Sequence, residues 1–178
     1  RTMPKRFIEP GVMITYGNHA SALLGVLIED VTGETYSEYV KKEIFSPLGM
    51  NDSSFKQPVP ENIRNKKITE YRYRDGNFTA VPVSYSHMVS AGGLHSTAAD
   101  LAKFLLVFQN ENSVFRKETL EKMTKVQYRP HPELSGVTYG FLEQRYKNNT
   151  YFYRTGDSEG AKAKIFLLPE QNTGIIIL

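Results

Sequence analysis

Apolar residues recur at helical spacing between residues 19 and 32, and this pattern predicts an amphipathic helix. Five aliphatic side chains share one face of that helix: Leu23, Leu24, Leu27, Ile28 and Val31. Gly33 follows, at the position where a residue in the left-handed conformation commonly ends a helix. We therefore expect one helix that ends at this glycine, preceded by an irregular segment over residues 1–17.

A second helix is predicted directly after the first. Thr35 and Glu38 have the spacing of a capping box, in which the two side chains satisfy backbone N–H groups at a helix start. The helix then contains four apolar residues: Tyr39, Val40, Ile44 and Phe45. Because proline cannot continue a helix, we expect it to stop before Pro47, ahead of a long loop over residues 46–66.

The middle of the chain predicts a hairpin and two further helices. Residues 68–83 alternate in the manner of two strands joined at Asp75–Gly76. A glycine turn at Gly92–Gly93 leads into a helix capped by Ser96 or Thr97, and a shorter helix is expected over residues 115–126. The longer of these two helices has an apolar stripe of four residues: Leu101, Phe104, Leu105 and Phe108.

From Tyr139 onward the pattern is that of β-strands. Four runs, YGFLEQRY, TYFYRTG, AKAKIFLLP and TGIIIL, are separated by turns at Asn148–Asn149, Asp157–Gly160 and Gln171–Gly174. Helices come first and a mostly antiparallel sheet comes last, which predicts an α+β (mixed α/β) fold. We expect residues 1–178 to belong to a single domain, helical over about 12–135 and sheet over about 136–178.

Composition excludes several classes of function. The net charge of +3 is spread along the chain, whereas a nucleic-acid surface concentrates its charge, so we expect no nucleic-acid partner. The absence of cysteine excludes disulfides and cysteine-based zinc sites. No apolar run is long enough to predict a transmembrane segment.

Because the chain starts at Arg1 and stops within the strand-like run GIIIL, we expect part of a longer protein, with a strand swap or a complementing chain as possible partners.

Two short motifs contain candidate chemistry. Tyr16 and Asn18 lie in the loop before the first helix, where side chains can point into a cleft. Tyr-x-Asn is a weak signal by itself, since Tyr146–Asn148 repeats it at a hairpin turn, where asparagine is expected for its tolerance of positive φ. Arg154–Gly156 ends a strand, and a cation, a hydroxyl and a glycine can hold a substrate carboxylate there. The alternative is an edge strand with an exposed arginine.

The remaining polar residues give weaker signals. Asp157 and Glu159 follow as an acidic pair that either is solvated or pairs with Arg154 and holds it. The four histidines lack the spacing of metal ligands, and we interpret them as structural: His19, His87, His95 and His131.

The two motifs and the longer segments around them resemble the penicillin-recognising serine hydrolases. The closer resemblance is to the branch of class C β-lactamases, DD-peptidases and family VIII esterases. Three segments carry it: PGVMITYGNHASALLGVLIEDVTGETYSEYVKKEIFSPLGMNDSSF, SAGGLHSTAADLAKFL and RTGDSEGAKAKIFLLPEQNTGIIIL. The resemblance implies a β-lactamase/transpeptidase-like fold, an antiparallel sheet flanked by helices, that is incomplete in this chain.

For catalysis, the resemblance implies that Tyr16 is the phenol that exchanges protons with the nucleophile and the leaving group. Asn18 would donate a hydrogen bond to the substrate amide and help to place the catalytic lysine. The family's nucleophile is a serine in Ser-x-x-Lys, N-terminal to the Tyr-x-Asn loop. Ser53 and Lys56 match that pattern, but they follow Tyr16 and lie in a proline-rich loop, so we exclude Ser53. We expect the nucleophile upstream of Arg1, and this chain alone to be inactive.

For substrate binding, the resemblance implies roles for the end of the Arg154 strand. Arg154 stands where the family usually has lysine or histidine, and arginine keeps the charge but cannot release a proton. Thr155 would hydrogen-bond the substrate, and Gly156 would keep the strand open. The backbone N–H of Asp157 would be one of two oxyanion donors.

The resemblance therefore implies a serine hydrolase that forms an acyl-enzyme with D-alanyl peptides, β-lactams or small esters. It implies neither a metal nor another cofactor, and it implies a longer protein that is extracellular or membrane-anchored. The alternative is a non-catalytic domain of the same fold that binds cell-wall peptides or a protein partner. Arg154 keeps this alternative open, because arginine is a poor proton relay.

Overall fold

The first two helices form as the sequence predicts. The computed structural model describes residues 5, 8–109 and 114–178. Helix α1 covers Asn18–Thr32, and Gly33 ends it at a φ of 71° by donating its N–H to the Glu29 carbonyl. Helix α2, Tyr36–Val40, continues as the π-helical turn η1, Lys41–Phe45. Thr35 accepts from the Glu38 N–H, which confirms it as the N-cap, whereas the Glu38 carboxylate accepts from the Thr35 hydroxyl in place of the backbone N–H of a full capping box.

The central segment contains the predicted hairpin and the two predicted helices, together with two short helices that the pattern does not predict, Glu61–Arg64 within the expected loop and Val89–Gly92 at the expected glycine turn. Strands β1, Tyr71–Arg74, and β2, Asn77–Ala80, pair antiparallel around Asp75–Gly76, where both residues have positive φ. This is the backbone of the two-residue turn that Asp-Gly favours. Thr97, rather than Ser96, caps the next long helix by accepting from the Asp100 N–H. The helices here are α3, Glu61–Arg64, α4, Val89–Gly92, α5, Ala98–Leu106, and α6, Lys117–Thr124.

The C-terminal segment folds into one antiparallel sheet in the order β3-β4-β5-β6. Its strands are β3, Leu142–Tyr146, β4, Asn149–Asp157, β5, Lys162–Leu168, and β6, Thr173–Ile177, with the 3₁₀ turn η2, Pro169–Gln171, between the last two. The first turn lies at Lys147–Asn148, one residue before its predicted place, and Lys147 has the positive φ expected of Asn148. The α+β fold that the sequence predicts is confirmed.

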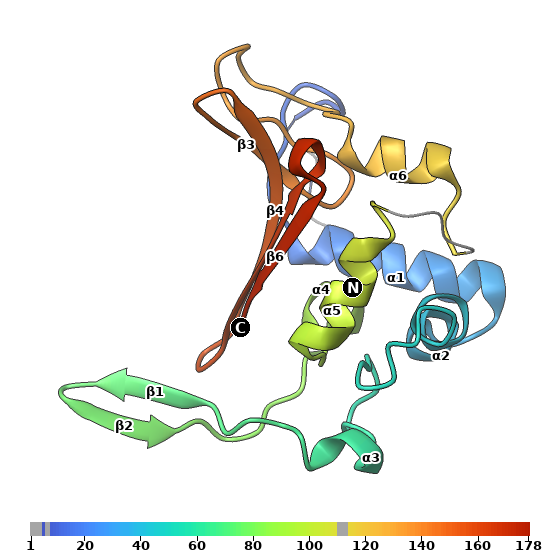
Figure 1. Cartoon of the computed structure of the whole chain (residues 1–178). Coiled ribbons are helices and arrows are strands. Elements are labelled where there is room, and N and C mark those ends of the chain that lie inside the picture. The colour runs from blue at the N-terminus through green and yellow to red at the C-terminus, as the bar shows by residue number, and fades with distance from the viewer. Residues whose placement is uncertain (1–4, 6–7, 110–113) are drawn as a thin grey trace.

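The helices and the sheet form two layers that meet along α5 (Figure 1). Phe104 of α5 packs against one buried cluster, Val40, Phe45 and Met50. Phe108, just after α5, packs against the second cluster, Phe141, Phe152 and Leu167, on the inner face of the sheet. The α5 segment therefore connects the helical core to the sheet core and fixes β4 relative to the helices.

The apolar face of α1 is not covered by the rest of the described chain. Leu24 and Val31 are 62 % and 77 % exposed, and Leu23 and Leu27 are exposed as well. The buried residue of this helix is Gly25, which lies against Ser90 of α4. The predicted helix is thus present, but it packs against α4 through Gly25, and its aliphatic face stays exposed.

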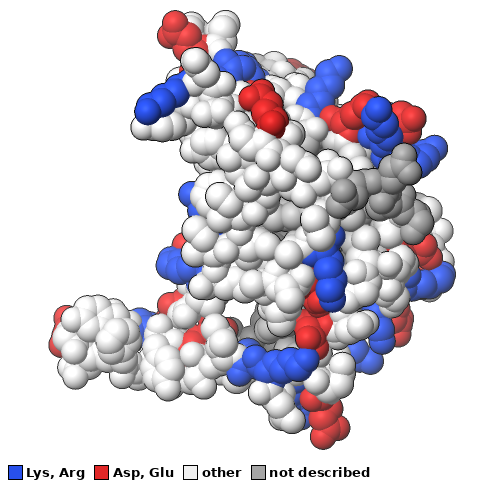
Figure 2. All heavy atoms as spheres, viewed as in Figure 1, with Lys and Arg blue, Asp and Glu red and all other residues white. Residues whose placement is uncertain are grey.

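In the view of Figure 2, positive and negative side chains are interspersed over the molecule. Within residues 5, 8–109 and 114–178, no helix is both long and apolar enough to cross a bilayer.

Candidate active site

The fold brings Tyr16 and Arg154 together from near opposite ends of the chain. The guanidinium carbon of Arg154 lies 5.4 Å from the centre of the Tyr16 ring, within the range of a cation–π contact. Tyr16 is 77 % exposed, whereas Arg154 is half-buried. The contact places a phenol and a permanent cation on one accessible surface.

Tyr16 lies on a loop that leads directly into α1. Gly17 is the N-cap residue in an extended conformation, and Asn18 is the first helical residue, with an exposed side chain. Tyr128 donates its hydroxyl proton to the Val12 carbonyl at 3.3 Å, which ties the loop to the segment before the sheet. The N-terminus of α1 adds a partial positive charge to that of Arg154, so this surface favours an anionic group.

The segment that contains Tyr128 is fixed to β3 by a buried carboxylate. Arg129 contacts both oxygens of Glu143, at 2.6 Å and 2.9 Å, and the Gly136 N–H donates to the same carboxylate. Burial opposes ionisation of Glu143, but these hydrogen bonds and the nearby arginine charges outweigh it and hold its pKa below the usual value. Glu143 thereby anchors the loop against which the Tyr16 segment rests.

The end of β4 has one open edge. Pairing with β3 ends at Tyr153, whereas pairing with β5 continues to Asp157 opposite Lys162. The Ser158 N–H donates to the Ala161 carbonyl across the turn, at 2.9 Å. Because hydrogen-bonded and non-hydrogen-bonded pairs alternate in an antiparallel ladder, the N–H and C=O of Asp157 and Thr155 point to the opposite edge.

This open edge suits an extended substrate. No strand in the described part of the chain pairs with residues 154–157 on that side. An unpaired edge can add a peptide through main-chain hydrogen bonds. The backbone N–H of Asp157 is therefore directed where a substrate carbonyl could accept from it.

Strand alternation separates the side chains of the Arg154 motif. Arg154 and Gly156 lie on the face of β4 that also carries buried Phe152, the face toward the helices. Thr155 lies on the opposite face, where it lines a cavity of about 280 Å³ with Gly156 and Asp157. The structure thus brings Arg154 to Tyr16 and directs Thr155 away from it.

The acidic pair after Gly156 does not hold Arg154. Asp157 pairs with Lys162, and Glu159 pairs with Arg72 of β1. Among the ion pairs of the described residues, none includes Arg154. This contact between Glu159 and the β1–β2 hairpin could not be found from sequence, because no local pattern joins the two segments.

Ser53 lies in a buried network that connects its loop to α5. Its hydroxyl donates to Asp100 at 2.9 Å and lies 2.8 Å from the Ser96 hydroxyl. Lys103 and the Asp52 N–H also contact the Asp100 carboxylate. Burial raises the pKa of Asp100, but the bonds from Lys103, Ser53 and Asp52 lower it more, so the pKa lies below its usual value.

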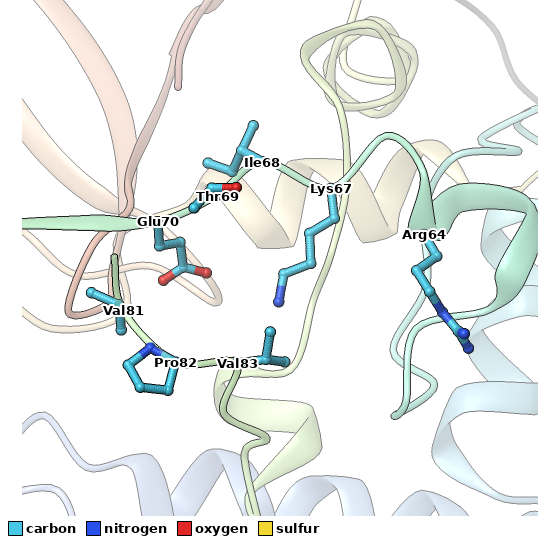
Figure 3. A pocket seen from close by; sticks show the side chains of 8 residues that line it. All are labelled: Arg64, Lys67, Ile68, Thr69, Glu70, Val81, Pro82 and Val83. Atoms are coloured by element: carbon cyan, nitrogen blue, oxygen red, sulfur yellow. The ribbon is translucent and has the colours of Figure 1, made fainter. Parts of the chain in front are cut away.

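A second cavity lies at the foot of the hairpin (Figure 3). It measures about 260 Å³, and its lining combines charged and apolar side chains: Arg64, Lys67, Ile68, Thr69, Glu70, Val81, Pro82 and Val83.

Among the residues that the structure describes, no group of three or more histidine, aspartate or glutamate side chains could hold a metal ion.

Several known proteins are similar to this chain. The D-alanyl-D-alanine-carboxypeptidase/endopeptidase AmpH of Escherichia coli K12 is 23% identical over 95% of this chain and 46% of its own length. The human mitochondrial serine beta-lactamase-like protein LACTB is 25% identical, over 93% of this chain and 35% of its own. The chain thus spans less than half the length of these two relatives.

Solved structures agree with this likeness. The octameric penicillin-binding protein homologue of Pyrococcus abyssi superimposes with a TM-score of 0.81 at 30% identity, over 96% of this chain and 39% of that one. A class C beta lactamase of Rhodobacter sphaeroides gives 0.78 at 15% identity, over 91% and 54%. The model of the Beta-lactamase family matches residues 3–178. The chain therefore belongs to the β-lactamase family, as its sequence motifs indicate.

Proposed function

We propose that this chain is the acid–base and substrate-binding part of a serine hydrolase that acts on D-alanyl peptides, β-lactams or small esters. The observation that carries the proposal is the contact between Tyr16 and Arg154 beside the open edge of β4. The relative from Escherichia coli is named a D-alanyl-D-alanine carboxypeptidase, which supports the first of these substrate classes.

In this proposal an upstream serine supplies the nucleophile. Its oxygen bonds to the substrate carbonyl carbon, its proton passes to a base that includes Tyr16, and the backbone N–H of Asp157 stabilises the oxyanion. The bond to the leaving amine or alcohol breaks as that group takes the proton. Water then attacks the ester carbon, which releases the acid and restores the serine.

Arg154 has a binding role in this scheme. A guanidinium pairs well with a carboxylate, such as the one that ends a D-alanyl peptide. It cannot release its proton near neutral pH, so it does not relay protons between Tyr16 and the substrate.

Intact-protein mass spectrometry tests the proposal. This chain and the longer protein that includes its upstream segment are each treated with a reactive penicillin and with an activated ester. We expect an adduct on the longer protein alone, formed at least about 100-fold more slowly in the Tyr16→Phe variant. The matched control is Tyr139→Phe, since Tyr139 is exposed in the loop before β3. An adduct on this chain that peptide mapping locates on Ser53 would instead assign the reaction to that serine.

The absence of any adduct would favour the non-catalytic alternative. Arg154 is the observation behind that alternative, because a cation that cannot relay protons still binds the carboxylate of a cell-wall peptide. Retention of a D-alanyl peptide by the unmodified protein, lost in Arg154→Gln, would then identify a binding domain.

Assembly with a second chain is a separate part of the proposal. Strand β6 pairs only with β5 among the described strands, so its other edge is open to a complementing strand. The relative from Pyrococcus abyssi is described as octameric. Light scattering on the longer protein measures whether it forms a multimer.

A further inference from the structure

The β1–β2 hairpin and its flanking residues form an arm, defined as residues 70–81, that extends away from the two layers (Figure 1). Every strand residue of this arm is exposed. The Val81 N–H donates to the Glu70 carbonyl at 2.8 Å, which closes the foot of the arm. The foot lies beside the turn that joins β4 to β5, the turn that directly follows Asp157.

Three contacts fix this foot to the β4–β5 turn. The Ser158 hydroxyl donates to the Glu70 carboxylate at 3.1 Å, and Arg72 forms an ion pair with Glu159. Gly160 lies so close that a Cβ there would be 2.8 Å from the Glu70 Cβ. Figure 3 shows Glu70 at the foot of the arm, next to Val81.

The turn itself is an extension of the strand end that contains Asp157. The Ser158 N–H donates to the Ala161 carbonyl, and the Ala161 N–H donates back to the Ser158 hydroxyl at 3.2 Å. The opposite edge of β4 has no strand partner beyond Tyr153 in the described chain. The arm therefore supports this turn from outside the sheet, in addition to the pairing of Asp157 with Lys162 of β5.

We propose that Glu70 and Arg72 are positioning residues that hold the Ser158–Gly160 turn and, through it, the Asp157 N–H. The catalytic part of this inference rests on the proposed function, in which that N–H binds the oxyanion. An oxyanion donor acts only at close range, and a displacement of about 1 Å can lower a rate by about 100-fold.

The ion pair between Arg72 and Glu159 and the close approach at Gly160 differ in strength. Arg72 and Glu159 are 48% and 54% exposed, and an ion pair this accessible is weak by itself. The close approach at Gly160 is the more sensitive contact, because an alanine there separates the arm from the turn without a positive φ to strain it. We therefore use Gly160→Ala as the main variant and Arg72→Ala as the second.

Arg74→Ala is the matched control. Arg74 lies on the same face of β1 as Arg72, and its ion-pair partner is Asp75 of the arm's own turn. Hydrogen exchange of the amides of residues 157–162 is measured by mass spectrometry in the longer protein. We expect exchange about tenfold faster in Gly160→Ala and about threefold faster in Arg72→Ala, and unchanged in Arg74→Ala.

Acylation by the activated ester is measured on the same variants, per active site. We expect kcat to be about tenfold lower in Gly160→Ala, with KM little changed. We also expect Arg72→Glu to lower kcat, and the second substitution Glu159→Arg to restore part of it. A merely structural role would reduce the number of active sites without changing kcat.

Each contrary result has a separate meaning. Unchanged exchange in both variants would overturn the inference that the arm holds the turn. Faster exchange with unchanged kcat would overturn its positioning role. If the unaltered protein forms no acyl-enzyme, the proposed function fails together with the positioning role, and the exchange data alone decide whether the arm holds the turn.

Discussion

Gly25→Ala tests how α1, which begins beside Tyr16, is seated on the rest of the protein. A Cβ at position 25 would lie 2.3 Å from the Ser90 hydroxyl oxygen and 2.6 Å from the Ser90 Cβ. Both distances are far below van der Waals contact, and Ser90 also donates to the Ser21 carbonyl at 3.0 Å. The substitution must therefore move α4 away from α1 or break this hydrogen bond.

The magnitude follows from two opposing effects. Overpacking costs about 1–3 kcal/mol, to which the lost hydrogen bond adds about 1 kcal/mol, whereas alanine favours a helix over glycine by about 1 kcal/mol. We expect a net loss of about 1–3 kcal/mol. In a protein of this size that corresponds to a fall in Tm of roughly 2–12 °C.

Thermal unfolding followed by circular dichroism measures this loss in a double-mutant cycle. Ser90→Gly alone loses the bond to Ser21 but removes the atoms that would clash, so Gly25→Ala should cost little in that background. Gly92→Ala is the control, since its Cβ would meet only the Ser86 hydroxyl at 3.9 Å. Equal costs of Gly25→Ala with and without Ser90 would refute the steric argument.

Two further predictions concern Glu143 and Arg154. The pKa of Glu143 is lower in the folded protein than in the unfolded chain. Its ionised carboxylate therefore stabilises the fold at any pH above its pKa in the unfolded chain, about 4.3. That stabilisation is lost as the pH falls through its pKa in the folded protein. The urea midpoint should therefore fall on acidification more steeply in the unaltered protein than in Glu143→Gln; parallel curves would contradict this. Arg154→Gln should slow acylation by carboxylate-bearing substrates about tenfold or more while sparing neutral esters, whereas Arg154→Lys should keep most of the rate. An equal loss on both substrate types would mean that Arg154 does not bind the carboxylate.

Most helices, strands and turns could be predicted from the sequence, because interactions between residues close together in the chain determine them. Three features each depend on residues within a few positions of one another: the Thr35 cap of the second helix, the left-handed Gly33 and the Asp75–Gly76 turn. The four strands and the α+β fold follow from the same short-range periodicity. The family was also evident at this level, because whole segments resemble it.

Tertiary structure decided which predicted residues meet. The sequence identified Tyr16 and Arg154 as candidates, but only the tertiary structure brings the loop before α1 to the end of β4 and places the cation over the ring. The acidic pair was assigned to Arg154 as one alternative, whereas Glu159 pairs with Arg72 in a distant hairpin. Lys147, not Asn148, takes the positive φ, because strand register fixes where the turn lies.

The same distinction explains two further features, the open edge of β4 and the exposed apolar face of α1. The open edge of β4 exists because β3 stops pairing at Tyr153 while β5 continues to Lys162, and register is set by whole-strand packing. The exposed stripe of α1 shows the converse, since periodicity predicts an apolar face but not what covers it. Sequence determined the local conformations and the candidate groups, and long-range packing and charge pairing determined their neighbours.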